Sequence, residues 1–333
     1  MMKVNLFLFS SVFVYLAIVH PKVAHAQEKT CIFVNSYSPG YHWSDEIDRG
    51  VVAGLDGACK LERLFLDSKK NKDKDSQKAK SLELKTIIDQ RNPDVVIVSD
   101  DNAVELVLAQ HYKNSKIPFV FCGLNWDITP YGLPYKNTTG MVEVAPIGPL
   151  FAEARKATEQ KLKTVSFIAA DNETQRKEFA RVEKYFLAAK VEITPLWIKN
   201  FEQFKKAYVD AQQSDFVLLW NTAGADGWKD SDAKDWILKN TKKLSASVYE
   251  NMIPFAGISF VKLGFEQGEY AGNAAAQILE GKPAREIKVI QNSRFDRYLN
   301  KEVTAKASVQ PSAEFVASAK PHTEWLNQSA SKK

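Results

Sequence analysis

Two patterns of apolar positions alternate along the chain. Short unbroken apolar runs, of which Cys31–Val34 is the first, predict strands buried on both faces. In longer segments the apolar side chains recur every third or fourth position, as at Trp43, Ile47, Val51 and Leu55, and predict a helix with one buried face. The next predicted strands are Leu61–Leu66, Asp94–Val98 and Ile117–Phe121, and the helices between them are Ser76–Arg91 and Asp100–Tyr112. This alternation predicts a parallel sheet covered by helices.

A loop at Asp127–Thr139, with Pro130, Gly132 and Pro134, interrupts this rhythm. A short extended piece, Met141–Val144, and the segment Pro146–Pro149 follow it before the next helix, and this stretch predicts a hinge crossing. The alternation then begins again. The strands predicted after the loop are Thr164–Ala170, Val191–Ile198, Asp215–Trp220, Ser245–Tyr249, Gly257–Leu263 and Ile287–Ile290. The helices predicted there are Asp171–Ala189, Phe201–Gln213, Lys229–Asn240 and Gln267–Gly281. The fold class is therefore α/β, with two doubly wound parallel-sheet lobes joined by a hinge and a ligand cleft between them.

The first residues have the pattern of a signal peptide. Lys3 is followed by the apolar run Leu6–Val19 and by the small-residue pattern Ala24-His25-Ala26. The apolar run is shorter than the roughly 20 residues of a membrane-spanning helix. We expect a signal peptide at residues 1–26, cleavage after Ala26, and a periplasmic protein.

Charge and histidine content exclude several classes of function. The net charge of +5 falls to +3 without Lys3 and Lys22, which is too weak to indicate a nucleic-acid partner. After the signal peptide only His42, His111 and His322 remain, and no HExxH, CxxC, GxSxG or P-loop motif occurs. The sequence predicts no catalytic residues, no metal site and no cofactor.

Three cysteines remain in the chain: Cys31, Cys59 and Cys122. Cys31 begins the first predicted strand and Cys59 follows the first predicted helix, so these two lie at the same end of a strand–helix unit. A Cys31–Cys59 disulfide is one interpretation. Three buried thiols that pack as small apolar side chains are the other.

Polar and aromatic residues gather where predicted strands end. The candidate ligand-binding residues are Ser36, Tyr37, Tyr41, Trp43, Ser99, Asp100, Asn125, Trp126, Asp171, Asn221, Thr222 and Tyr249. Rings can stack on a ligand while amides and carboxylates orient it. Acidic residues already stand at the predicted helix starts and oppose an anionic ligand, which favours a neutral or amine-bearing one. The alternative is that these acids only cap helices.

Several segments together resemble a known family. They are Asn35–Trp43, Pro93–Asp100, Gly264–Gly272, Ala275–Pro283 and Asn300–Ala307. They are similar to the periplasmic substrate-binding proteins of ABC transporters, in the type I periplasmic-binding-protein class. The resemblance implies two lobes, three crossovers, closure on a ligand, and a position near that ligand for Ser36, Asp100, Asn125, Asp171 and Asn221. The loop that carries Tyr37, Tyr41 and Trp43 is more aromatic than expected for much of the family.

The domain boundaries predicted with this resemblance are residues 27–142 plus 264–285 for the N-terminal lobe and 143–263 plus 286–320 for the C-terminal lobe, with a flexible tail at 321–333. The expected function is that of a monomeric exported solute-binding protein, which captures a small molecule and delivers it to the membrane permease of an ABC importer. One alternative is a sensory protein that signals to a membrane receptor kinase, because similar aromatic loops occur in sensory domains. An enzyme on the same fold is the third reading.

Overall fold

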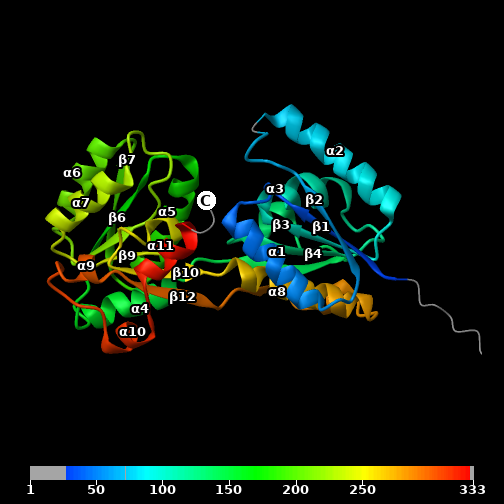
Figure 1. Ribbon diagram of the computed structural model, residues 1–333. Coiled ribbons are helices and arrows are strands. Elements are labelled where there is room, and N and C mark those ends of the chain that lie inside the picture. The colour runs from blue at the N-terminus through cyan, green and yellow to red at the C-terminus, as the bar shows by residue number, and fades with distance from the viewer. Residues whose placement is uncertain (1–27, 72, 331–333) are drawn as a thin grey trace, which may run out of the picture.

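The computed structural model describes residues 28–71 and 73–330, which form two α/β lobes side by side (Figure 1). The predicted signal peptide lies outside these residues. Within them, no helix combines the length and the apolar character needed to cross a membrane.

The first lobe is built on a fully parallel sheet. Its strand order is β11-β5-β4-β3-β1-β2. The strands are β1 (Thr30–Asn35), β2 (Lys60–Phe65), β3 (Val95–Ser99), β4 (Phe119–Asn125), β5 (Thr138–Glu143) and β11 (Ile290–Gln291). The helices are α1 (His42–Leu55), α2 (Lys74–Arg91), α3 (Asp100–Ala103), the π-helix η1 (Val104–Ala109) and α8 (Gly264–Leu279), with short 3₁₀ turns η2 (Thr129–Tyr131) and η4 (Ala284–Glu286). Every residue of β3 is buried, as its β-branched sequence predicts for a central strand.

The second lobe has a sheet of order β13-β12-β10-β9-β8-β6-β7, parallel except where β10 meets β12. The strands are β6 (Thr164–Ala170), β7 (Glu192–Ile198), β8 (Phe216–Leu219), β9 (Ser245–Ser247), β10 (Ile258–Lys262), β12 (Phe295–Leu299) and β13 (Lys320–Pro321). The helices are α4 (Ile147–Ala157), α5 (Glu173–Ala188), α6 (Phe201–Ala211), α7 (Asp230–Asn240), α9 (Lys301–Thr304), α10 (Ala313–Ser318) and α11 (His322–Ala330), with the 3₁₀ turn η3 (Glu250–Met252). The predicted α/β fold with two sheets is confirmed.

Two of the predicted boundaries differ from the structure. The strand expected at Ile287–Ile290 in the second lobe is β11 of the first sheet, because Ile290 pairs with Met141 and Thr139 donates a hydrogen bond to the carbonyl of Ile287. The segment predicted as a flexible tail begins with β13 and α11. Pro321 pairs with Leu299 in the second sheet, which anchors α11 to that lobe.

Helices α1 and α8 pack so closely that only glycine fits at their crossing. A Cβ on Gly268 would lie 1.9 Å from the carbonyl oxygen of Ile47, and one on Gly50 would lie 2.2 Å from that of Phe265. Gly54 and Gly272 make the same close approach. This contact fixes Trp43 at the start of α1 against the start of α8, where the chain has just entered the first lobe.

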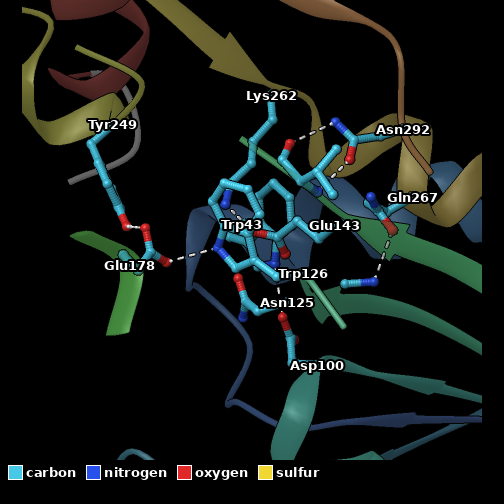
Figure 2. A network of polar contacts seen from close by, with 12 residues as sticks. Trp43, Asp100, Asn125, Trp126, Glu143, Glu178, Tyr249, Lys262, Gln267 and Asn292 are labelled. Carbon is cyan, nitrogen blue, oxygen red and sulfur yellow. Dashed lines mark hydrogen bonds and ion pairs between the residues drawn. The ribbon is translucent and has the colours of Figure 1, made fainter. Parts of the chain in front are cut away.

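Three segments cross between the lobes, and hydrogen bonds join them. They follow β5, β10 and β11. The side chain of Asn292 accepts from the backbone N–H of Val144 at 2.7 Å and donates to its carbonyl at 3.2 Å, which ties the third crossing to the first (Figure 2). The carboxylate of Glu266 in α8 accepts from the backbone N–H groups of Ser293 and Arg294, both at 2.9 Å. The crossings therefore form one connected hinge.

Cys31 and Cys59 form a disulfide with a Cα–Cα distance of 5.9 Å, and Cys122 is free and buried. The bridge joins the start of β1 to the turn between α1 and β2. Helix α1 ends at Leu55, before Cys59, because Asp56 adopts a left-handed conformation with φ of 45°.

Candidate functional site

The candidate site lies where the carboxyl ends of the first lobe's strands face the second lobe. Two residues there hold the left-handed conformation that side chains rarely adopt: Asp100 after β3, with φ of 67°, and Trp126 after β4, with φ of 62°. Gly123 lies beside Asp100, with φ of 66°, and a Cβ there would approach Asp100 Oδ1 to 3.0 Å. Backbone strain of this kind concentrates at functional sites.

Asp100 is a buried carboxyl group with one oxygen left open. Its side chain is 3% exposed, and Oδ1 accepts a hydrogen bond from Trp43 Nε1 at 2.8 Å (Figure 2). Among the described residues, Oδ2 has no hydrogen-bond partner. Burial, together with the nearby charge of Glu143, raises the pKa of Asp100 well above its usual value. Burial of Asp100 thus favours its neutral form over the carboxylate.

Glu143 at the end of β5 and Lys262 at the end of β10 form a largely buried ion pair across the hinge. The ammonium of Lys262 lies 5.5 Å from the ring centre of Trp43 and 6.0 Å from that of Tyr249. Burial lowers the pKa of Lys262, but the charges of Glu143 and Glu178 together raise it by more. Its pKa therefore lies above the usual value, and the ammonium stays charged. Burial raises the pKa of Glu143, and Lys262 opposes that shift.

Glu178 in α5 accepts hydrogen bonds from three aromatic side chains. The donors are Trp126 Nε1 at 3.2 Å, Trp220 Nε1 at 3.1 Å and the Tyr249 hydroxyl at 2.8 Å. Figure 2 shows Trp126 and Tyr249 reaching Glu178 from different sides. Trp126 belongs to the first lobe and the other donors to the second, so this carboxylate links the lobes. Burial and the charge of Glu178 raise the pKa of Tyr249 well above its usual value.

A pair of tyrosines borders these acids on the first lobe. The rings of Tyr37 and Tyr41 meet edge to face at 5.2 Å, and the Lys69 ammonium lies 3.2 Å from the centre of the Tyr41 ring. Burial, followed by the charge of Asp100, raises the pKa of Tyr37, so its hydroxyl stays protonated and can donate a hydrogen bond.

A cavity of about 390 Å³ opens beside this group, lined by both lobes. Trp43 and Glu46 of α1 line one side, and Lys262 and Glu250 line the other. His42 Nε2 lies 3.5 Å from Glu250 Oε1, a second contact between the lobes. We call Trp43, Asp100, Trp126, Glu143, Glu178, Tyr249 and Lys262 the interlobe site.

The charges of the interlobe site do not balance. Asp100, Glu143 and Glu178 are 3%, 4% and 7% exposed. Lys262 is the cation inside this set, whereas Lys69 is exposed and Arg181 is half-buried against the Trp126 ring. Buried charges interact more strongly than exposed ones, because water screens the latter. The described residues of the interlobe site thus include more buried carboxyl groups than buried cations.

Four of the residues predicted from sequence come together here: Trp43, Asp100, Trp126 and Tyr249. Tyr37 and Tyr41 border them, and Asn125 is bonded to Asp101 instead, through Nδ2 to Oδ2 at 2.6 Å.

The other predicted residues serve different contacts. The Ser36 hydroxyl donates to the carbonyl of Ser99 at 2.6 Å, and the Ser99 hydroxyl donates to Asn35 at 3.0 Å, so both hold strand ends together. Asp171 accepts from Arg176 at 2.6 Å, and Asn221 accepts from the backbone of Ala223 at 2.9 Å. Thr222 lines a separate cavity.

Sequence reasoning missed Glu143, Glu178 and Lys262. Glu143 and Lys262 share one signal, because each is the single charged residue of its strand. A buried charge requires a partner, so the two isolated charges of opposite sign could have been paired. Glu178 in its polar helix α5 gives no such signal.

Within residues 28–71 and 73–330, no cluster of three or more His, Cys, Asp or Glu could hold a metal ion. Single carboxylates and aromatic rings are groups that can hold an organic ammonium without a coordination shell.

Comparison with known proteins identifies a family whose model spans most of the chain. The family model described as "ABC transporter substrate binding protein" matches residues 43–323. No curated protein matches the chain significantly. A ligand-free, open substrate-binding protein with adhesive properties from Clostridium difficile has a TM-score of 0.68 at 14% identity, with 88% of this chain and 98% of that chain covered.

Two further solved structures are similar. The ABC domain in complex with L-Trp from Streptococcus pneumonia has a TM-score of 0.58 at 15% identity, with 88% of this chain and 99% of that chain covered. A periplasmic ribose ABC transporter protein from Conexibacter woesei has a TM-score of 0.55 at 13% identity, with 83% and 93% covered. At these identities the likeness shows the two-lobed fold alone.

Proposed function

The chain belongs to the ABC transporter substrate-binding protein family, and from this premise we propose that it captures a small amine-bearing molecule between its lobes and delivers it to the permease of an ABC importer. The protein acts in the periplasm and breaks no bond in its ligand. The ligand's ammonium binds at the interlobe site.

The excess of buried carboxyl groups over buried cations carries this proposal. The open oxygen of Asp100 is the strongest single element, because a buried acceptor without a partner is costly and an ammonium donor would remove that cost. A ligand anion would instead meet Asp100, Glu143 and Glu178 in a region with little water. A neutral ligand would leave the charge of the site unchanged.

Aromatic rings complete the recognition of a cation. Trp43 and Tyr249 already flank an ammonium, that of Lys262. Ring faces attract cations by roughly 0.5–2 kcal/mol, depending on desolvation. The chain's own lysine thus shows the chemistry that a ligand ammonium would meet beside it.

Both lobes contribute to the site, which supports closure on the ligand. Trp126 and Glu178 belong to different lobes and are already hydrogen-bonded. A ligand that contacts both lobes binds the closed state better than the open one and shifts the equilibrium toward closure. The closed shape would then be the form that a permease recognises.

A thermal-shift screen tests the ligand class. The panel holds aromatic amines, polyamines and amino acids, with sugars and dicarboxylates as contrasts. An amine at about a thousand times its Kd should add roughly 4 kcal/mol of stability. Asp100→Asn and Glu178→Gln should reduce the shift, and Asp171→Asn, which changes a carboxylate outside the site, should not.

Sugars or dicarboxylates that shift the wild type while every amine fails would refute the amine proposal. Delivery is tested separately with the importer in proteoliposomes. Its ATPase activity should rise with liganded protein and stay at the basal level with Asp100→Asn at the same ligand concentration. Binding without any stimulation would contradict the transport part alone.

A further inference from the structure

A second cavity, larger than the one between the lobes, lies on the second lobe. Its volume is about 640 Å³, within the range of roughly 300–1,000 Å³ that is usual for small-molecule sites. Helices α7 and α11 and the segments after β8 and β9 line it, and Figure 1 shows α11, in red, against this lobe. It shares no lining residue with the interlobe site or with the cavity beside it.

Three aromatic rings form walls held in fixed positions. Trp228 Nε1 donates to Asp230 at 2.9 Å, and Trp325 Nε1 donates to Glu250 at 2.9 Å. Phe255 meets the Trp228 ring edge to face at 5.4 Å. Because both indole N–H groups already have acceptors, these rings offer apolar surface to the cavity.

One buried hydroxyl gives the cavity a polar point. Thr222 is 4% exposed, and its hydroxyl donates to the sulfur of Met252 at 3.4 Å. A thioether is a weak acceptor, and the hydroxyl oxygen keeps lone pairs of its own. A ligand O–H or N–H group could therefore donate to Thr222.

The charged residues at the rim do not favour an ionic ligand. Lys234 is paired with Glu302 at 2.8 Å, and the carboxylate of Asp230 accepts from Trp228. The first turn of α7 contains both Asp230 and Asp232, which opposes an anion at that helix start. A neutral molecule meets no such cost.

We propose that this cavity is a second binding site, which takes a small uncharged molecule with one aromatic ring and one hydroxyl or N–H donor. The ring lies between Trp228, Phe255 and Trp325, and the donor bonds to Thr222. Phenols and indoles belong to this chemical class.

The test is isothermal titration of the full chain with p-cresol and with indole, together with ligand-observed NMR. We expect one molecule of either probe to bind per chain. Ala225→Phe, which fills the cavity from its lining, should weaken binding at least about tenfold. Leu187→Phe adds the same ring on an exposed position of α5 and should leave binding unchanged. Should Ala225→Phe fail to fold, Thr222→Val removes the hydroxyl at constant shape and should lower affinity by about fivefold or more.

Two results would overturn the proposal. The first is that neither probe binds the wild-type chain at millimolar concentration. The second is that Trp43→Ala abolishes probe binding while Ala225→Phe does not, since p-cresol and indole would then bind at the interlobe site. Neither result would bear on amine binding there.

Discussion

Asp100→Asn removes the charge that the open carboxylate oxygen can present to a ligand ammonium, at almost constant shape. The variant keeps an oxygen that can accept the hydrogen bond from Trp43 Nε1. A hydrogen bond to a charged group contributes about 1.5–3 kcal/mol, which corresponds to an affinity loss of roughly tenfold to a hundredfold. We expect a loss in this range for an amine ligand at pH 8.

The wild type should also bind the amine more tightly as pH rises. In the ligand-free protein, burial, Glu143 and Asp101 raise the pKa of Asp100, and the hydrogen bond from Trp43 and the charge of Lys69 oppose these effects. A ligand cation lowers this pKa, so binding below the raised pKa releases a proton. The Kd should then fall by up to about tenfold per pH unit until the pH passes that pKa. Asp100→Asn cannot release a proton and should show a flatter profile.

Ionisation of Asp100 also affects the stability of the ligand-free protein. This stability should fall as pH rises, whereas the affinity for the amine should increase. Because the pKa is raised in the folded state, the folded chain holds a proton that the unfolded chain has lost. The stabilisation that comes from the raised pKa of Asp100 is complete below the pKa of Asp100 in the unfolded chain. It is lost as pH rises through the pKa of Asp100 in the folded chain. Relative to the wild type, Asp100→Asn should therefore gain up to about 1.4 kcal/mol of stability per pH unit across that window.

Calorimetric titration between about pH 5 and pH 8 measures the first effect, in two buffers of different ionisation enthalpy that report proton release. Urea unfolding over the same pH values measures the second effect. Asp171→Asn is the matched control, because Asp171 bonds to Arg176 outside the site. Parallel pH profiles for wild type and Asp100→Asn would refute the role assigned to Asp100.

Three other outcomes follow from the packing of the lobes. Gly268→Ala should destabilise the protein by about 1–3 kcal/mol in urea unfolding, since its Cβ would overlap the Ile47 carbonyl. Gly148→Ala is the control, because the nearest contact of its Cβ lies at 3.4 Å and the change should cost little stability; equal effects would contradict the close helix contact. Trp126→Phe should separate the lobes and increase the radius of gyration in solution scattering, because it removes the hydrogen bond to Glu178; an unchanged radius would show that this bond does not hold the lobes. Cys59→Ser should lower stability by roughly 3 kcal/mol, because the disulfide closes a loop with a sequence separation of 28; an unchanged unfolding curve would argue against the bridge.

The two-lobed fold could be predicted because its signals are local and strong. The run Val95–Val98 is apolar and β-branched throughout, and the repeat from Trp43 to Leu55 marks one face of a helix. Strand β11 could not be predicted in its true place, since two residues carry no periodicity. Its membership of the first sheet depends on pairing with Met141, far away in sequence.

The site could be predicted in part, for a physical reason. Residues after parallel strands gather at one edge of a sheet, so position alone predicted that Asp100, Trp126 and Tyr249 would lie near one another. A position after a strand does not determine where the side chain points. Ser36 holds such a position, but its hydroxyl donates to the backbone carbonyl of Ser99. Glu143 and Lys262 each stand out as the single charge of a strand, but their distance from each other depends on how the three crossings lie together, which the local sequence does not show.

The measurement that tests the central claim most directly is a calorimetric comparison of two ligands on the wild-type chain. One is the amine that binds best in the screen, and the other is the alcohol that replaces its ammonium with a hydroxyl. The interlobe charge excess predicts that the amine binds at least about tenfold more tightly, and that Asp100→Asn removes most of this difference. Equal affinity for the two ligands, in both proteins, would contradict the account.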